Sequence, residues 1–275
     1  MERTRSRSFL CKYQERWRTS RSLLCVGLDS DIRQLPACLA REANPIWEFN
    51  RRIIDATAEF ACAFKPNLAF YLSDGFRGME ALRRTVDYIP EEIPVILDCK
   101  VGDIGSTMEQ YAQSFFDRLR VDAITLNPLM GEDVLQPLLR REGYFAFALA
   151  LTSNPSARDF FLEGGMAELV AGWIGRFPAQ QLGAVIGATQ TDDLRRMRGL
   201  LPGRIFLIPG IGAQGGDLEA VLTNAVDSAE EPNILINSSR GIIFRESGER
   251  FAEAAAVAAG ELRDRIRRGC SGLSG

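Results

Sequence analysis

Eight short apolar runs, separated by segments with helical spacing, constrain the fold of this chain more than any other feature of its sequence. The runs cover 23–29, 62–71, 93–98, 122–127, 144–153, 183–189, 204–210 and 233–239. Between them, apolar residues recur at intervals of three and four, most clearly from Met108 to Leu119 and also in 46–60, 218–225 and 251–266. Because parallel strands need helical crossovers, this alternation predicts an α/β fold, a (β/α)8 TIM barrel. A doubly wound open sheet is the alternative.

The length of the chain fits one barrel domain. Its 275 residues contain no linker, low-complexity block or shift in composition that would divide them. We expect an N-terminal arm or helix over 1–20, the barrel over 21–268 and a flexible tail over 269–275. The arm is rich in arginine, which we interpret as a solvated face, with a binding tail as the alternative.

The composition argues against several classes of partner and location. A formal net charge of -3 provides no basic footprint for nucleic acid. No apolar run reaches the eighteen or so residues of a membrane span, and the N-terminus lacks the apolar core of a signal peptide. The six cysteines form no CxxC pair and several lie in apolar runs, as reduced buried thiols do. We therefore expect a cytoplasmic protein without a nucleic-acid or membrane partner.

Histidine is absent and lysine is rare, which limits the kinds of catalysis that this chain can perform. The chain has no histidine, which excludes a Ser-His-Asp relay, a His-ligated metal and any imidazole acid–base step. Among its 33 lysines and arginines, the lysines are Lys12, Lys65 and Lys100 alone. Lysine is needed where a compact, tunable ammonium acts, since guanidinium is bulkier and keeps its proton. Lys65 and Lys100 lie in strand-like runs and are therefore candidate functional residues.

Polar residues gather where the apolar runs end. They are Asp29, Lys65, Asn67, Asp98, Lys100, Asp103, Asn127, Thr152, Ser153, Asn154, Thr189, Ser238, Ser239 and Arg240. In a parallel barrel the carboxyl ends of all strands meet at one face, and active sites are built there. The sequence therefore predicts a polar active site at that face.

The stretch from Asp98 to Asp103 alternates charges after the third run. Side chains alternate along a strand, so we expect Asp98 and Lys100 on the same side and Cys99 towards the helical layer. A neighbouring aspartate favours the protonated lysine, which makes Lys100 a candidate proton donor rather than an imine-forming amine. A structural salt bridge among Asp98, Lys100 and Lys65 is the alternative. Asp103, beside Gly102, has the alternative role of a helix N-cap.

The loop PGIGAQGGD, 209–217, has the composition of a phosphate cradle. Its glycines allow the backbone to approach an anion closely, and the amides that open the next helix point towards it. The loop also satisfies G-x-G-x-x-G, but it follows the seventh run, and Arg240 stands where a dinucleotide fold has an acidic residue. A glycine-rich loop with an arginine after the eighth run is typical of a phosphate-binding barrel. Tight turns and a surface arginine are the alternative.

Seven motifs together resemble the orotidine 5'-phosphate decarboxylase family. They are LCVGLDSD, AFKPNLAFY, LDCKVGDIGST, TLNPLMG, LTSNP, IPGIGAQGGD and NSSRGI, in this order from about Leu23 to Phe244. The NPLMG and TSNP stretches are similar to the second bacterial subgroup of that family. The resemblance implies decarboxylation of orotidine 5'-monophosphate to UMP in pyrimidine biosynthesis, without a cofactor or metal. It also implies a homodimer whose active sites are shared between subunits.

The resemblance also implies roles for individual residues. Lys65, Asp98, Lys100 and Asp103 would form a charged tetrad, with Lys100 protonating C6 and Asp103 reaching across from the partner subunit. The substrate-binding residues would be Asp29, Thr107, Ser153, Gly212, Gln214, Ser239 and Arg240. Within this set, Asp29 and Lys65 would bind ribose hydroxyls, with Thr107 of the partner subunit near the ribose. Ser153 would contact the pyrimidine, and Gln214 and Arg240 would bind the phosphate, aided by amides near Gly212 and Ser239.

Three other functions remain as alternatives. A metal-dependent sugar-phosphate lyase of the same superfamily shares D-x-K-x-x-D, but it places a Mg²⁺-binding carboxylate on the second strand, where this chain has Lys65. A class I aldolase would form an imine at Lys100. A non-catalytic binder of nucleoside monophosphates would bind UMP and turn over nothing.

Overall fold

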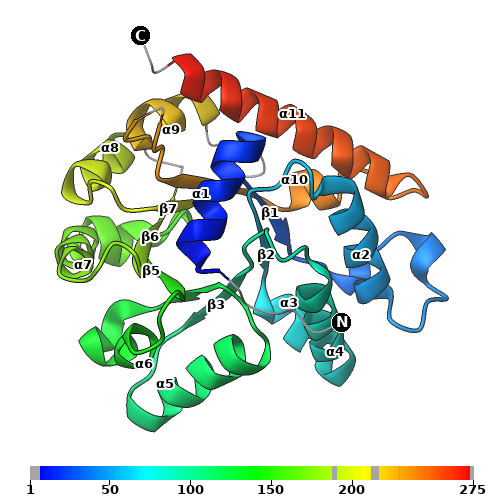
Figure 1. The fold of residues 1–275 in the computed structure, drawn as a ribbon, viewed down its shortest axis with the longest axis horizontal. Coiled ribbons are helices and arrows are strands. Elements are labelled where there is room, and N and C mark those ends of the chain that lie inside the picture. The colour runs from blue at the N-terminus through cyan, green and yellow to red at the C-terminus, as the bar shows by residue number, and fades with distance from the viewer. Residues whose placement is uncertain (1–6, 188–190, 212–216, 229, 273–275) are drawn as a thin grey trace.

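Eight parallel strands form a barrel in the computed structural model, which describes residues 7–187, 191–211, 217–228 and 230–272 (Figure 1). The strands are β1 (Leu24–Leu28), β2 (Ala63–Pro66), β3 (Ile96–Val101), β4 (Ala123–Leu126), β5 (Phe145–Leu151), β6 (Leu182–Ile186), β7 (Phe206–Pro209) and β8 (Ile234–Ser238). The hydrogen-bonded order is β2-β1-β8-β7-β6-β5-β4-β3. Parallel bridges from Phe64 to Val95 and from Asn67 to Asp98 join the two ends of this sheet. The predicted barrel is confirmed, and the open-sheet alternative is wrong.

Helices surround the barrel and connect its strands. They are α1 (Phe9–Ser20), α2 (Pro45–Thr57), α3 (Leu68–Leu72), α4 (Gly75–Tyr88), α5 (Gly105–Ala112), α6 (Gln136–Leu139), α7 (Met166–Gly175), α8 (Thr191–Leu200), α9 (Leu218–Ala225), α10 (Arg240–Ile243) and α11 (Phe251–Ser271). A π-helical segment, Gln113–Arg118, continues α5, so the periodic stretch from Met108 to Leu119 is helical as predicted. None of the helices among the described residues has both the length and the apolar character that a bilayer crossing requires.

Strands β2 and β3 depart from the predicted bounds in ways that affect the polar residues. The run 62–71 is a strand only as far as Pro66, because the Asn67 side chain accepts the N–H of Ala69 and begins α3. In the third run, β3 continues past Asp98 to Val101. Both departures occur at the carboxyl end of a strand, so they decide how the polar residues there are presented.

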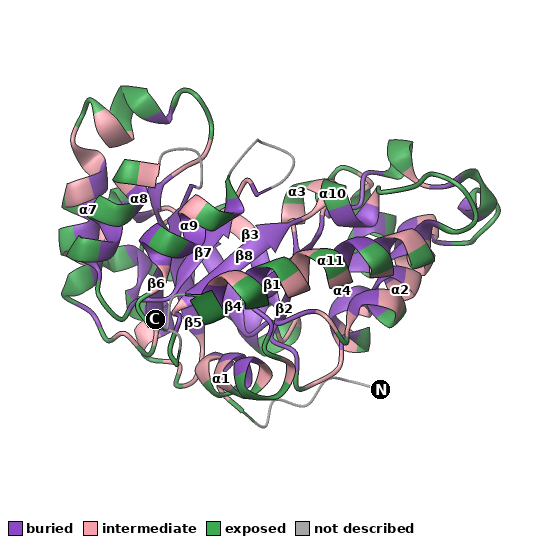
Figure 2. Cartoon of the chain, turned by 90° about the horizontal axis from the view of Figure 1, so that it is seen from above, coloured by how far each residue is buried: buried purple, intermediate pink, exposed green. Residues whose placement is uncertain are grey.

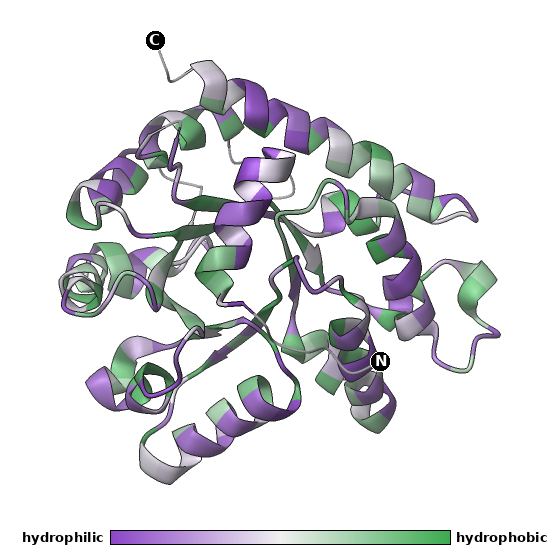
Figure 3. Ribbon diagram, viewed as in Figure 1, coloured by the Kyte–Doolittle hydropathy of each residue, from purple (hydrophilic) through white to green (hydrophobic). Residues whose placement is uncertain are grey.

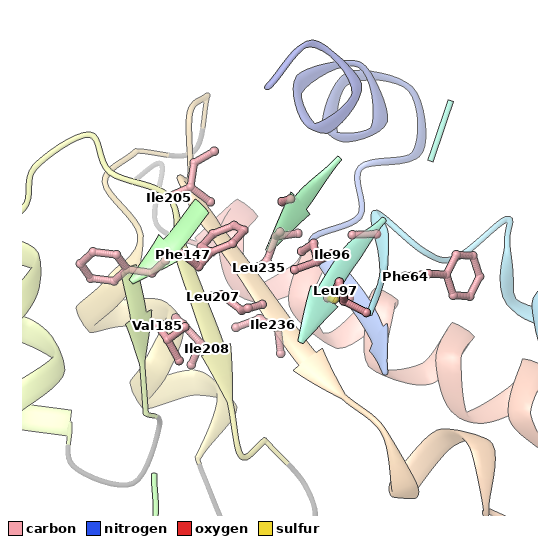
Figure 4. Close-up of a cluster of buried hydrophobic side chains, with 14 of the residues drawn as sticks. Phe64, Ile96, Leu97, Phe147, Val185, Ile205, Leu207, Ile208, Leu235 and Ile236 are labelled. Atoms are coloured by element: carbon pink, nitrogen blue, oxygen red, sulfur yellow. The ribbon is translucent and has the colours of Figure 1, made fainter. Parts of the chain in front are cut away.

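The core lies inside the barrel and between the barrel and its helices. Figure 2 shows buried strands at the centre and exposed residues on the outer helical faces, and Figure 3 shows the matching change from apolar strands to mixed helices. Inside the barrel, the side chains of Phe147, Leu207 and Leu235 gather from β5, β7 and β8 (Figure 4). This apolar filling closes the barrel interior beneath its carboxyl face.

The N-terminal helix α1 covers the opposite end of the barrel (Figures 1 and 2). Phe9 stacks on Phe145, and the Trp17 indole donates to the Glu230 carbonyl ahead of β8. The buried Lys12 ammonium lies 2.8 Å from Asp122, just before β4. The expectation of a solvated arm is therefore wrong for this face of the helix, because its aromatic side chains are buried against the strand starts. At the other end of the chain, α11 continues through Ser271, into the stretch 269–275 that we expected to be a tail.

Candidate active site

A pocket of about 310 Å³ opens at the carboxyl ends of the strands. Its lining residues come from six strands and from the segment after β5: Lys65, Asp98, Lys100, Thr125, Leu149, Thr152, Ser153, Asn154, Val185, Leu207 and Pro209. Charged groups from β2 and β3 face apolar side chains from β5, β6 and β7. A pocket with apolar walls and a few converging charges is the usual form of a small-molecule site.

Lys65, Asp98 and Lys100 form a row of alternating charge in this pocket. The Lys65 ammonium lies 2.8 Å from Asp98 Oδ2, and the Lys100 ammonium lies 2.5 Å from Asp98 Oδ1. The side chains of Lys65 and Asp98 are 4% and 10% exposed, whereas that of Lys100 is 48% exposed. Lys100 is therefore the member of the row that a bound molecule can reach directly.

Lys65 and Asp98 hold each other in their charged forms. Burial by itself lowers the pKa of Lys65, but the charges of Asp98 and Asp29 outweigh burial and raise that pKa above its usual value. Burial acts to raise the pKa of Asp98, while Lys65 and Lys100 together hold that pKa well below its usual value. The carboxylate and the buried ammonium are thus both ionised at neutral pH.

These directions predict a pH-dependent contribution of Asp98 to stability. Ionised Asp98 stabilises the fold above about pH 4, the usual pKa of aspartate in an unfolded chain, and this contribution is lost as the pH falls towards the lower folded pKa. For Lys65 the stabilisation is complete below about pH 10 and is lost as the pH rises through its raised pKa. We expect Asp98→Asn to lower the free energy of unfolding by about 3 kcal/mol at pH 7, because Lys65 loses its nearest counter-charge.

Urea unfolding of both proteins between pH 3 and pH 7 measures this effect. The difference between them should be constant down to about pH 5 and should shrink below about pH 4. The exposed Asp192→Asn is the control, with an expected change of about 0.5 kcal/mol or less. A difference that stayed constant down to pH 3 would show that the fold does not depress the pKa of Asp98.

The backbone of β3 is irregular between Asp98 and Lys100. The pairing of β3 with β4 shifts register between Leu97 and Val101, and Lys100 has a φ of +47°. Asp98 and Lys100 therefore face the same pocket as predicted, and Cys99 does not line it, but the strand between them is bulged rather than regular. The side chain of Thr125 on β4 lies against the bulge, and sequence reasoning missed this residue. Its position two residues before Asn127 in the fourth run was the available signal, because both share the inward register.

Asp29 and Ser153 lie just after the carboxyl ends of β1 and β5. Asp29 Oδ1 is buried and has no hydrogen-bond partner in the part of the chain that the structure describes, and its carboxylate is close enough to Lys65 to affect the pKa of that residue. Ser153, after β5, lines the pocket. A buried acceptor without a partner costs free energy, which a hydroxyl group of a bound molecule would recover.

Asp103 and Thr107 lie outside the pocket of their own chain. The Asp103 carboxylate accepts the N–H of Ile104, the next residue, at 2.8 Å. The N-cap of α5 is Ile104, so the N-cap interpretation of Asp103 is wrong. Thr107 is exposed in the first turn of α5. Within the described part of one chain, the geometry does not bring either residue to the Lys65–Asp98–Lys100 row.

The predicted phosphate corner is described only in part. Arg240 begins α10 directly after β8, is exposed, and forms no ion pair with the described residues. The Ser239 hydroxyl donates to the Gly27 carbonyl at 3.2 Å, which ties β8 to β1. Gly212 and Gln214, and also Thr189, lie outside the described residues.

Lys65 also bears on the lyase alternative. Its ammonium occupies the inward position on β2, 2.8 Å from the first carboxylate of D-x-K-x-x-D. A fixed cation at this position repels a divalent metal and uses an oxygen that the metal would need. Across the part of the chain that the structure describes, no group of three or more carboxylate or thiol side chains is arranged to hold a metal ion.

Comparison with known proteins assigns the family. A model of the "Orotidine 5'-phosphate decarboxylase / HUMPS family" matches residues 22–255. The orotidine 5'-phosphate decarboxylase of Porphyromonas gingivalis is 44% identical to this chain, over 86% of this chain and 88% of its own length. That of Herpetosiphon aurantiacus is also 44% identical, over 90% of this chain and 93% of its own length.

Solved structures agree with the sequence relatives. The OMP decarboxylase of Leishmania donovani superposes with a TM-score of 0.82 at 36% identity, covering 96% of this chain and 99% of that one. The UMP synthase of the same organism superposes with a TM-score of 0.82 at 39% identity, covering 95% of this chain and 57% of that longer one. The match in sequence and fold leads to one conclusion: the chain belongs to the orotidine 5'-phosphate decarboxylase / HUMPS family.

Proposed function

We propose that this chain decarboxylates orotidine 5'-monophosphate to UMP, with Lys100 as the cation and the proton donor at C6 of the pyrimidine. The observation that carries the proposal is the Lys65–Asp98–Lys100 row in a pocket whose other walls are apolar. The relatives at 44% identity are named as enzymes of this activity. The roles of the individual residues below are part of the same proposal.

The reaction needs a fixed positive charge and then a proton. When the bond from C6 to the carboxylate breaks, CO₂ leaves and the electron pair stays on C6, with no carbonyl sink of the usual kind. An ammonium beside C6 stabilises this developing charge, as preorganised electrostatic groups do in other enzymes. Lys100 then transfers a proton from Nζ to C6, forming the C–H bond of UMP, and recovers a proton from solvent. Its 48% exposed side chain is accessible for both steps.

Asp98 and the apolar wall have complementary roles. Through Oδ1, Asp98 holds the Lys100 ammonium in place, and through Oδ2 it holds Lys65. Leu149, Val185 and Leu207 line the facing side of the pocket. In such water-poor surroundings a charge interaction is stronger than in bulk water. An apolar wall also disfavours a charged group beside it, so it favours conversion of the substrate carboxylate into neutral CO₂.

The rest of the nucleotide is bound by groups around this row. Asp29 and Lys65 bind ribose hydroxyls, which supplies the missing partner of Asp29 Oδ1. Ser153 contacts the pyrimidine from the segment after β5. Phosphate contacts remote from C6 accelerate the reaction by driving closure of loops over the base. The candidates are the segment after β5 and the segment after β7, most of which lies outside the described residues.

Arg240, Gln214 and amides near Gly212 and Ser239 form the phosphate site in this proposal. Arg240 is suited to the role because its guanidinium is exposed at the carboxyl face and forms no ion pair with the described residues. Arginine binds phosphate oxygens in a bidentate geometry that lysine cannot reproduce.

The proposal includes a homodimer with shared active sites. Among the described residues of one chain, Asp103 has only its neighbour's N–H as a partner, so its carboxylate is available to a second subunit. Large apolar residues are exposed next to it at the same face: Ile104 is 51%, Leu129 67% and Met130 53% exposed. An isologous dimer across this face would cover them and bring Asp103 and Thr107 of the partner subunit to the substrate.

We also propose a cytoplasmic location. All six cysteines are free thiols, and Cys25, Cys62 and Cys270 are buried in the core. Unpaired thiols of this kind suit a reducing compartment.

A continuous ultraviolet assay of the purified protein with orotidine 5'-monophosphate tests the function. We expect turnover to UMP that EDTA leaves unchanged. Loss of activity in EDTA would favour the lyase-type metal site, and covalent trapping by borohydride with substrate would favour imine chemistry at Lys100. Binding of UMP without any turnover of orotidine 5'-monophosphate would show that the protein is a non-catalytic nucleotide binder and would contradict the proposal.

A further inference from the structure

The backbone at Lys100 is held in a conformation that its side chain disfavours. Its φ of +47° lies in the left-handed region, whereas strand residues have φ near -120°. Any side chain with a Cβ is strained there, because the Cβ approaches the carbonyl oxygen. The pairing of β3 with β4 breaks at the same place, between Leu97 and Val101. Something other than the strand ladder must therefore hold this bulge.

The hydroxyl of Thr125 is the group that holds it. The Cys99 N–H donates to Thr125 Oγ1 at 3.1 Å, and the Lys100 N–H donates to the same oxygen at 3.0 Å. The hydroxyl itself donates to Asp98 Oδ1 at 2.9 Å. Thr125 is 1% exposed, on the inward register of β4.

These three hydrogen bonds use the whole capacity of the hydroxyl. A threonine oxygen has two lone pairs and one proton, and here both lone pairs face backbone N–H groups while the proton faces the carboxylate. The side chain therefore lines the pocket without a free polar valence for the substrate. Its hydrogen bonds act on Lys100 and Asp98 instead. The bonds from the N–H groups fix the bulge that carries Lys100. The bond to the carboxylate sets the rotation of Asp98, to which the Lys100 ammonium binds.

We propose that Thr125 is a positioning residue, which places the Lys100 ammonium by stabilising the bulge and orienting Asp98. This inference rests on the proposed decarboxylase function for its kinetic consequence, and on the geometry of β3 and β4 alone for its structural consequence. Without the hydroxyl, two N–H groups and one carboxylate oxygen lose a partner in a buried site, and the backbone of Lys100 relaxes towards the extended conformation. The ammonium is then displaced from C6, and placement errors of about 1 Å are enough to slow catalysis about 100-fold.

The test compares four variants by kcat, KM and affinity for UMP. Thr125→Val keeps the shape and removes the hydroxyl, and we expect kcat to fall about 100-fold, with KM and the Kd of UMP within about threefold. Thr125→Ser restores the oxygen and should keep at least about one third of wild-type kcat. Thr125→Cys offers only a weak hydrogen-bonding group and should lose about tenfold. Thr85→Val is the matched control, because Thr85 is a buried hydroxyl that accepts from Asn50 and lies outside the pocket lining.

Rates are expressed per UMP-binding site, so that a loss of folded protein does not count as a loss of kcat. Wild-type kcat in Thr125→Val, or a serine variant as slow as the valine variant, would overturn the proposal. If Thr125→Val does not fold, an unchanged kcat in Thr125→Cys would overturn it instead.

A crystal structure of Thr125→Val provides an assay-independent result. We expect Lys100 to have a negative φ in that structure, and a φ that stayed near the wild-type +47° would overturn the positioning role whatever the activity. Absence of turnover in wild-type protein, together with a relaxed Lys100 in the variant, would instead count against the proposed reaction and support the role of Thr125 in shaping the site.

Discussion

Replacement of Lys100 with alanine is expected to lower kcat about 10⁵-fold. The ammonium both stabilises charge at C6 and donates the proton; electrostatic groups of the first kind contribute about 10²–10³-fold and general acids about 10²–10⁴-fold. Binding of UMP should change by no more than a few fold, because the ribose and phosphate contacts belong to other residues. Steady-state assay and titration with UMP measure the two quantities separately.

Two control variants test whether the loss of kcat in Lys100→Ala comes from the missing proton donor. Lys100→Arg keeps a positive charge that does not release its proton, so turnover should remain low although the charge is present. Cys99→Ala changes the adjacent residue of the same bulge and should keep kcat within about tenfold, because the Cys99 thiol contacts backbone groups of Thr125 and Val101 and does not line the pocket. Substantial turnover by Lys100→Ala would show that the proton comes from another group.

Mixing subunits of Lys100→Ala and Asp103→Ala, each inactive alone, is expected to restore activity. In a heterodimer, the barrel of the Asp103→Ala subunit keeps Lys100 and receives an intact Asp103 from its partner. The other site lacks both groups. Random reassociation makes half of the dimers heterodimers with one working site in two, so about one quarter of wild-type activity should return.

A second mixture controls for this result. Asp98 and Lys100 are in contact within one chain, so Lys100→Ala mixed with Asp98→Ala yields two defective sites in every heterodimer and should restore nothing. Lack of activity in a purified Lys100→Ala/Asp103→Ala heterodimer would argue that Asp103 does not act across the interface. The same outcome would not contradict the role proposed for the Lys65–Asp98–Lys100 row, which lies within a single chain.

Local patterns were enough to predict the strands, several of the helices and the end of the barrel that carries the polar residues. Each apolar run contains a strand in the structure, because burial on both faces leaves a nearly continuous apolar segment in the sequence. Lys65 and Asp98 could be named as partners although 33 positions separate them, since the carboxyl ends of parallel strands converge. The solvated-face interpretation of the arginine-rich arm missed its buried face, because the aromatic residues there only acquire a partner when the barrel closes.

The sequence by itself determined which residues stand at the strand ends and which charges they carry, since periodicity and residue type are local properties of the chain. Only the tertiary structure decided the path of the chain at Lys100. That path depends on a hydroxyl from β4, Thr125, which takes two N–H groups away from the regular ladder of β3. These hydrogen bonds join residues that are separated by 25 and 26 positions in the sequence, so they leave no periodic signal. A bulge of this kind is therefore visible only once the two strands lie side by side.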